Sequence, residues 1–307
     1  MQFDLAIIGG GPGGVAAGVY ASRKHLKTVF ITDDWGGQSN VSGEIQNWIG
    51  EISITGADFA HKLKEHLKAY AGSFVTIADG ERATAVTKTE GGFSIQTNKN
   101  TYTTKTVLIT AGAARRKLQI QGAAEFDQKG LTYCASCDGP LFADMDTAVI
   151  GGGNAAFDTA AQLLAYTKSV TLLHHSAEFK GDPATVEKVL SNPKMKAIRN
   201  VEPLEVKGEQ FVKSIVYLDK ETNEKHELPV AGIFVEIGML PNTAFVKELV
   251  KLDEYNRVIV DPKTQRTSVE GVWAAGDCTD GLYHQNNISA GDAVKALEDI
   301  YAHISSH

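Results

Sequence analysis

The stretch Leu5-Ala6-Ile7-Ile8-Gly9-Gly10-Gly11-Pro12-Gly13-Gly14 joins a short apolar run to a glycine-rich turn. A helical pattern follows to about Lys24, and a second apolar run occupies residues 28–31. Strand, glycine-rich turn, helix and strand in this order are typical of a dinucleotide-binding unit. In such a unit the turn and the helix N-terminus bind a pyrophosphate.

The same design recurs in the middle of the chain. The apolar run 147–150 precedes Gly151-Gly152-Gly153-Asn154-Ala155-Ala156, a helical pattern extends to about Tyr166, and residues 170–173 are again apolar. Two such units predict an α/β fold with two doubly wound, Rossmann-like nucleotide-binding domains.

The remaining patterns predict how the two domains are connected. Residues 83–105 and 201–228 alternate polar and apolar side chains, as β-ribbons do, and each ribbon leads into an apolar strand pattern, at 107–110 and 231–237. A last strand pattern at 272–275 ends in a Gly-Asp element, and 288–304 form an amphipathic helix pattern. We therefore predict that residues 1–115 and 243–307 form one domain, into which residues 116–242 are inserted as the second.

Both glycine-rich turns have the spacing that a dinucleotide requires. Gly9, Gly11 and Gly14 fit G-x-G-x-x-G, and Asp33 follows at the distance where a carboxylate holds ribose hydroxyls. The second turn has the G-x-G-x-x-A form from Gly151 to Ala156. The alternative in each case is a glycine-rich turn without a ligand.

The second ribose site has an unusual composition. The strand at 170–173 ends in His174-His175-Ser176, with neither an acid for ribose hydroxyls nor an arginine for a 2′-phosphate, and Lys180 is the nearby cation. The lack of arginine weakly favours NADH over NADPH.

Composition excludes several classes of protein. The formal net charge of −7 disfavours nucleic acid and anionic membranes as partners, because both require clustered cations. No apolar run is long enough for a transmembrane helix, and Met1-Gln2-Phe3-Asp4 lacks the cations of a signal peptide. Three cysteines do not form a secreted disulfide framework, so we expect a cytoplasmic protein.

Cys134 and Cys137 form the only C-x-x-C pair. At this spacing one thiolate can attack a partner disulfide while the other resolves the mixed disulfide, and Asp138 beside them can move protons. A zinc site would need further ligands, and Cys278 offers no second pair, so we expect no metal. Two inert cysteines are the other alternative.

Together the motifs resemble the low-molecular-weight thioredoxin reductase family over nearly the whole chain. The carrying segments are 9–14, 36–38, 47–50, 134–140, 151–154 and 274–277. Residues 138–142 and 231–243 are similar to the flavoprotein subunit of alkyl hydroperoxide reductase. That relative has an N-terminal disulfide domain, which we expect to be missing here, so a comparable electron relay would come from a separate protein.

The resemblance implies FAD in the first domain, nicotinamide in the second, a homodimer, and domain rotation during turnover. It assigns Cys137 as the sulfur near the flavin, Cys134 as the sulfur presented to the partner, and Asp138 as the acid–base residue. The FAD contacts would be Gly9, Gly11, Pro12, Gly13, Gly14, Asp33, Gly37, Gln38, Asn47, Ala111, Gly112, Gly276, Asp277, Gln285 and Asn286. The NAD(P) contacts would be Gly151, Gly153, Asn154, Ala155, Ala156, His174, His175, Lys180 and Gly238.

Two segments depart from the family. NADPH-preferring reductases have His-Arg-Arg-x-x-Phe-Arg where this chain has residues 174–180, and the peroxide-reductase relative has an acid at position 174. His284 replaces an arginine that is common in thioredoxin reductases. The electron donor and the partner surface therefore stay open.

The predicted reaction passes electrons from NAD(P)H through FAD and the Cys134–Cys137 disulfide to thioredoxin or a thioredoxin/glutaredoxin-like protein. The alternatives are a reductase of a peroxiredoxin-linked disulfide carrier, a flavin enzyme with ferredoxin as donor, a dithiol oxidase, and a nucleotide-sensing module without turnover.

Overall fold

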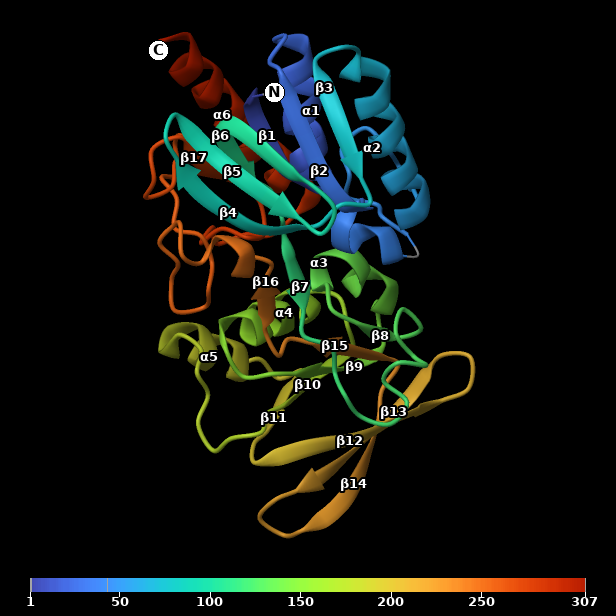
Figure 1. Ribbon diagram of the computed structural model, residues 1–307. Coiled ribbons are helices and arrows are strands. Elements are labelled where there is room, and N and C mark those ends of the chain that lie inside the picture. Colours follow the sequence, from blue (N-terminus) through green and yellow to red (C-terminus); the bar gives the residue numbers. More distant parts are fainter. Residues whose placement is uncertain (1, 43, 307) are drawn as a thin grey trace. The chain divides into compact units, whose positions relative to one another are not determined.

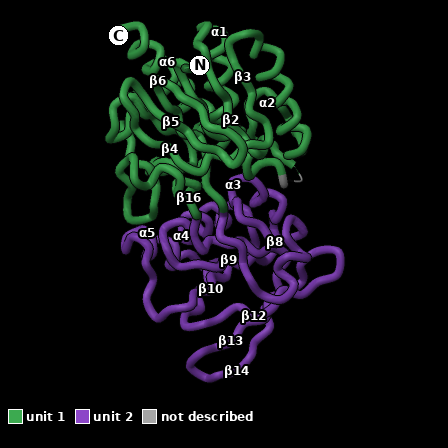
Figure 2. The backbone as a smooth tube through the Cα atoms, in the orientation of Figure 1, with its two compact units in different colours: residues 1–114, 240–307 green, residues 115–239 purple. Residues whose placement is uncertain are grey.

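The computed structural model (Figure 1) describes residues 2–42 and 44–306. Two compact units divide the chain, residues 1–114 with 240–307 and residues 115–239 (Figure 2). The connecting segments, β7 (Ala113–Arg115) and β16 (Met239–Pro241), pair with each other in a two-stranded sheet. Among the described residues, no helix is both long and apolar enough to cross a membrane.

The first unit is built on a seven-stranded sheet. Its parallel strands are β1 (Gln2–Gly10), β2 (Thr28–Trp35), β3 (Val75–Asp79), β6 (Thr101–Ile109) and β17 (Val272–Ala274). The ribbon strands β4 (Ala83–Thr89) and β5 (Gly92–Thr97) continue the sheet from β6 in antiparallel order. The predicted ribbon and the strand at 107–110 are thus joined, since β6 runs unbroken from the ribbon into the core. The change from polar to apolar residues along β6 marks burial and not a strand end.

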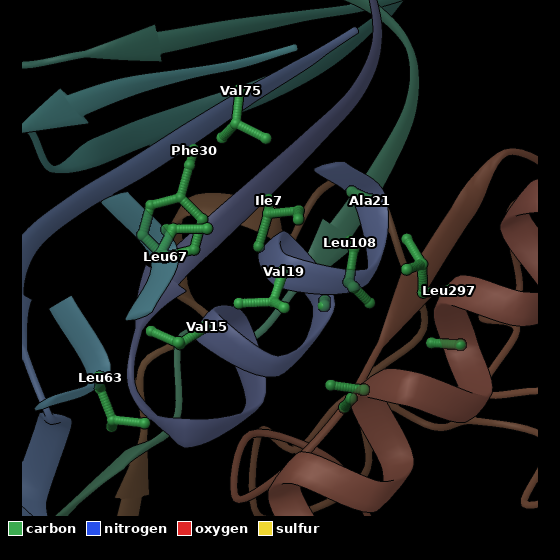
Figure 3. Close-up of a cluster of buried hydrophobic side chains, with 14 of the residues drawn as sticks. Ile7, Val15, Val19, Ala21, Phe30, Leu63, Leu67, Val75, Leu108 and Leu297 are labelled. Atoms are coloured by element: carbon green, nitrogen blue, oxygen red, sulfur yellow. The ribbon is translucent and has the colours of Figure 1, made fainter. Parts of the chain in front are cut away.

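Three helices pack on one face of this sheet. They are α1 (Pro12–Arg23), α2 (Gly56–Ala71) and α6 (Asn286–Ser305). Figure 3 shows Ile7, Phe30 and Leu108 from the sheet with Val15 and Val19 of α1, Leu63 and Leu67 of α2, and Leu297 of α6. Helix α2 begins where the Thr55 hydroxyl accepts a hydrogen bond from the Asp58 N–H (3.1 Å), a standard N-cap. The apolar side chains of the three helices therefore cover one face of the sheet.

The second unit has a five-stranded sheet in the order β11-β10-β9-β15-β8, and every pair in it is parallel. The strands are β8 (Leu131–Thr132), β9 (Asp146–Ile150), β10 (Ser169–Leu173), β11 (Met195–Ile198) and β15 (Gly232–Val235). Helices α4 (Asn154–Leu163) and α5 (Pro183–Leu190) accompany it, and Phe157 of α4 is fully buried in the core. A separate antiparallel sheet contains β12 (Val201–Gly208), β13 (Val212–Asp219) and β14 (Glu224–Pro229).

Candidate active site

In the first unit, most of the residues predicted to contact FAD lie where parallel strands end. The glycine-rich turn follows β1, Gly37 follows β2, Ala111 and Gly112 follow β6, and Gly276 and Asp277 follow β17. Because carboxyl ends of parallel strands share one edge of a sheet, the fold brings these segments together. Asp33 lies near the end of β2, where its carboxylate is 2.5 Å from the Arg82 Nε.

The geometry of the first glycine turn fits a bound pyrophosphate. A Cβ on Gly14 would lie 1.8 Å from the Gly9 carbonyl oxygen, so only glycine allows α1 to pack this closely on β1. A Cβ on Gly11, by contrast, would meet nothing within 4 Å. No side chain caps α1, and its first-turn N–H groups are therefore available to an anion.

Hydrogen bonds join the predicted polar contacts to α6. The Asn47 Nδ2 donates to the Gln285 Oε1 (3.1 Å), and the Ser39 hydroxyl donates to the Asn286 Oδ1 (2.8 Å). The Asp277 carboxylate accepts from the Ser289 hydroxyl (3.3 Å), and the His284 Nδ1 lies 3.6 Å from it. The Gln38 side-chain amide donates to the Ala113 carbonyl.

The second unit places the second fingerprint and the cysteine pair on the same edge of one sheet. Gly151 follows β9, His174 follows β10, Gly238 lies beyond β15, and Cys134 lies two residues beyond β8. A Cβ on Gly151 would lie 2.4 Å from the Glu236 carbonyl oxygen, whereas one on Gly153 would meet nothing within 4 Å. This turn therefore has the same combination of close packing and open space as the first.

The loop after β10 folds back on this turn. The Lys180 N–H donates to the Gly152 carbonyl (2.7 Å), and the Asp182 N–H donates to the Asn154 Oδ1 (2.6 Å). His174 is only 2% exposed, and its ring lies against Gly152, where a Cβ would be 2.2 Å from the Nδ1. Burial lowers the pKa of His174. His175 and Lys180 are exposed, so His174 supports the turn while its neighbours face solvent.

Two charged residues at this edge were not predicted from sequence. Glu236, directly after β15, is nearly buried; its carboxylate lies 3.0 Å from the Arg115 Nη1 and accepts from the Thr159 hydroxyl (3.0 Å). Arg199 follows β11 and donates from Nη1 to the Ala177 carbonyl (3.0 Å). Each directly follows a parallel strand, but the sequence contains no local pattern that identifies either position.

Cys134 and Cys137 form a disulfide, with their Cα atoms 5.3 Å apart. Both residues are partly exposed, and Cys134 is the N-cap of the single-turn helix α3 (Ala135–Asp138). The backbone of this turn is held by two bonds, from the Cys134 N–H to the Thr132 hydroxyl (3.3 Å) and from the Asp138 N–H to the Cys134 carbonyl (3.1 Å). An accessible disulfide in a fixed turn is suited to exchange with a partner thiol.

Asp138 has the environment of a proton donor. Burial raises the pKa of its carboxyl group, while the Thr132 hydroxyl donates a hydrogen bond to it and partly offsets this effect. Cys278, in contrast, is fully buried, and burial raises the pKa of its thiol to about 12. Cys278 therefore stays a protonated packing residue.

Replacing Tyr166 by phenylalanine is expected to raise the free energy of unfolding by about 1 kcal/mol. The Tyr166 hydroxyl is buried without a partner in the described part of the chain, next to Gly139, which follows the redox turn. Thermal unfolding of the full chain measures the change. The matched variant Tyr133→Phe removes a hydroxyl that accepts from the Leu118 N–H (3.1 Å) and should be destabilised instead. Equal losses in both variants would contradict the prediction.

Comparisons with known proteins agree with this geometry. Residues 3–295 match the family model described as pyridine nucleotide-disulphide oxidoreductase. The chain is 38% identical over 303 residues to the F subunit of alkyl hydroperoxide reductase in Staphylococcus aureus, covering 98% of this chain and 59% of that protein. It is 36% identical over 294 residues to the NADH dehydrogenase of Bacillus subtilis, covering 96% and 57%. The chain thus spans less than two thirds of the length of these relatives.

A solved structure matches over the whole length. Thioredoxin reductase from Streptococcus pyogenes has 30% sequence identity and a TM-score of 0.92, and the match covers 100% of this chain and 99% of that one. The fold is therefore that of two Rossmann-like domains, as predicted. The chain belongs to the pyridine nucleotide-disulphide oxidoreductase family, in the group of low-molecular-weight thioredoxin reductases and their relatives.

Proposed function

We propose that this chain transfers electrons from NAD(P)H through FAD to the Cys134–Cys137 disulfide and then to thioredoxin or a thioredoxin/glutaredoxin-like protein. The observation that carries the proposal is the presence of an accessible disulfide, a carboxyl whose pKa is raised by burial, and a dinucleotide fingerprint on one edge of one sheet. FAD, when bound, supplies the two-electron step between the nicotinamide and the sulfur atoms. We further propose that the enzyme is a homodimer, as its family resemblance implies, and that it is cytoplasmic, because its three cysteines do not form a secreted disulfide framework.

Each of the two units would bind one of the two cofactors. The glycine turn of residues 9–14, with Asp33, Asn47, Asp277 and Gln285, would hold FAD in the first unit. In the second unit, the turn from Gly151 to Ala156 would hold the nicotinamide nucleotide. Helix N-termini without side-chain caps support both assignments, since each offers N–H donors to a pyrophosphate.

The exchange with the partner follows from the cysteine chemistry. The Cys134 thiolate attacks one sulfur of the partner disulfide, a mixed disulfide forms, and the other partner sulfur leaves and takes up a proton. The Cys137 thiolate then attacks the Cys134 sulfur, which releases the second partner thiol and restores the Cys134–Cys137 disulfide. Two electrons and two protons pass to the partner, and Asp138 is placed beside Cys137 to deliver a proton.

A second candidate is a reductase that serves a peroxiredoxin-linked disulfide carrier. The similarity to the F subunit of alkyl hydroperoxide reductase supports it, with 38% identity over 303 residues. Both candidates share the cysteine chemistry and differ in the partner alone.

Anaerobic titration of the flavin-loaded chain tests the proposal. NADH or NADPH should bleach the flavin absorbance, and addition of oxidised thioredoxin should restore it. A panel of thioredoxin, a glutaredoxin-like protein and a peroxiredoxin-linked carrier then identifies the acceptor by kcat/KM. The proposal is wrong if neither nucleotide bleaches the flavin.

Asp138→Asn is expected to lower the rate of disulfide exchange by about 100-fold and to change its pH dependence. Because the pKa of Asp138 is raised, the carboxyl is a donor below that pKa, and the wild-type rate should fall as pH rises through it. The free energy of unfolding should also fall as pH rises. The folded state holds the Asp138 proton more tightly than the unfolded state, so this stabilisation is lost as pH rises from the unfolded-state pKa through the raised pKa of the folded state.

Stopped-flow exchange with thioredoxin and urea unfolding, each measured across pH, check the two effects of this substitution. The asparagine variant should lose the falling limb in both profiles. A variant that keeps both limbs would assign them to another group.

A further inference from the structure

The loop after β10 is held by cations from other elements. The Arg199 Nη1 donates to the Ala177 carbonyl (3.0 Å), and the Lys220 Nζ donates to the His175 carbonyl (3.1 Å). Lys180 lies on the loop itself, and Arg199, Lys220 and Lys180 are all exposed. The structure therefore supplies positive charge to a loop in which the sequence offered one lysine.

Arg199 is the best oriented of these groups. Its guanidinium carbon lies 5.7 Å from the centre of the Phe179 ring, and Phe179 packs edge-on against Phe157 of α4, with ring centres 5.0 Å apart. A guanidinium held by an aromatic face and one carbonyl loses little entropy when it binds an anion. Its bond to Ala177 uses one of the five N–H donors of an arginine.

The strand register places Arg199 beside the ribose end of the fingerprint. Leu173 and Ile198 are paired in parallel strands, and the His174 N–H donates to the Ile198 carbonyl (2.9 Å). Arg199 directly follows β11, and His174 directly follows β10, so the two residues lie at the same edge of the sheet. A hollow of about 440 Å³ opens here, lined by Ala177, Ala197, Ile198, Arg199, Asn200 and Glu221.

We propose that Arg199 binds the 2′-phosphate of NADPH and makes this chain selective for NADPH over NADH. The inference rests on the proposed function in one respect, that a nicotinamide nucleotide binds at Gly151–Ala156. Positions 175 and 176 are His and Ser in this chain, so no arginine there can bind the 2′-phosphate. Arg199, which follows the neighbouring strand β11, takes that role. Glu221, whose carboxylate accepts from the Asn200 Nδ2 (2.6 Å), opposes a phosphate in the same hollow. The loop itself contains the carboxylates of Glu178 and Asp182, and the Asp182 carboxylate accepts from the Thr185 N–H at the start of α5 (2.9 Å).

Arg199→Met tests this role, because methionine keeps apolar contact with Phe179 and removes the charge. The variant should raise the KM for NADPH in anaerobic flavin reduction by about 10- to 100-fold and leave the KM for NADH within about twofold. Arg199→Lys should fall between, since lysine keeps the charge without the fork of donors. Lys194→Met is the matched control: Lys194 bonds to the Thr167 carbonyl at the opposite end of β10 and β11, and its removal should affect neither nucleotide.

Calorimetric titration with adenosine 2′,5′-bisphosphate and with 5′-AMP separates this inference from the proposed function. The wild type should bind the bisphosphate more tightly than 5′-AMP, and Arg199→Met should lose that difference. If this holds while neither NADPH nor NADH reduces the flavin, the proposed function fails and the role of Arg199 stands. Equal affinity of the wild type for both compounds, or a preference that survives in Arg199→Met, would overturn the inference.

Discussion

Replacing Cys134 by serine is expected to lower thioredoxin reduction by a factor of about 10³ or more and to leave reduction of the flavin by NAD(P)H intact. Cys134 and Cys137 form the disulfide, and exchange requires a sulfur nucleophile that can reach the partner. Serine preserves the size of the side chain but cannot form a mixed disulfide. Steady-state thioredoxin reduction and anaerobic flavin bleaching, measured on the same preparation, separate the two half-reactions.

Two further variants make this result specific. Cys137→Ser should also abolish turnover, but it leaves Cys134 free to form a mixed disulfide with the partner that cannot be resolved, and that adduct is detectable by mass. Cys278→Ser should retain turnover, since that thiol is buried and its pKa is raised to about 12. Survival of full thioredoxin reductase activity in Cys134→Ser would remove the pair from the mechanism.

Much of the fold follows from local patterns in the sequence. An apolar run followed by a glycine turn and a helix identifies β1 with α1, and β9 with α4, because turn geometry and burial are encoded within about 30 residues. The short strand β11 (Met195–Ile198) was not predicted. It is only partly buried at the sheet edge, and Lys196 interrupts its apolar pattern. Strand β8 has two residues, too few for any periodicity.

The site was predictable where one motif contains its own chemistry. Cys134, Cys137 and Asp138 lie within five residues of sequence, and the glycine turns are recognisable from the spacing of their glycines. Glu236 and Arg199 are different, because their roles depend on which strands are neighbours, and strand order is not written in a local pattern. Arg199 reaches the loop after β10 because β11 pairs with β10. The assignment of individual residues to FAD or nicotinamide stays a prediction, since neither spacing nor packing identifies the ligand.

Glu236→Ala is expected to lower the free energy of unfolding by about 2 to 4 kcal/mol, the largest stability effect that we predict for a charged residue. The Glu236 side chain is 8% exposed and lies 3.0 Å from the Arg115 Nη1. Burial raises the pKa of Glu236 more than the attraction of Arg115 lowers it. Keeping this side chain ionised in the folded state therefore costs free energy. Alanine removes that cost, but it also leaves the Arg115 charge without this partner, cancels the bond from Thr159 and opens a cavity.

The comparison with glutamine separates charge from packing in this prediction. Glu236→Gln keeps the volume and an acceptor for the Thr159 hydroxyl, so it should be destabilised less than the alanine variant. Glu209→Ala is the surface control: its pair with Lys213 is exposed on both sides, and removal should produce no measurable change. Urea unfolding of the full chain measures all three. If Glu236→Ala is as stable as the wild type, the ion pair with Arg115 contributes nothing to the second unit. If alanine and glutamine cost the same, the loss comes from the charge and not from the cavity, since glutamine leaves no cavity.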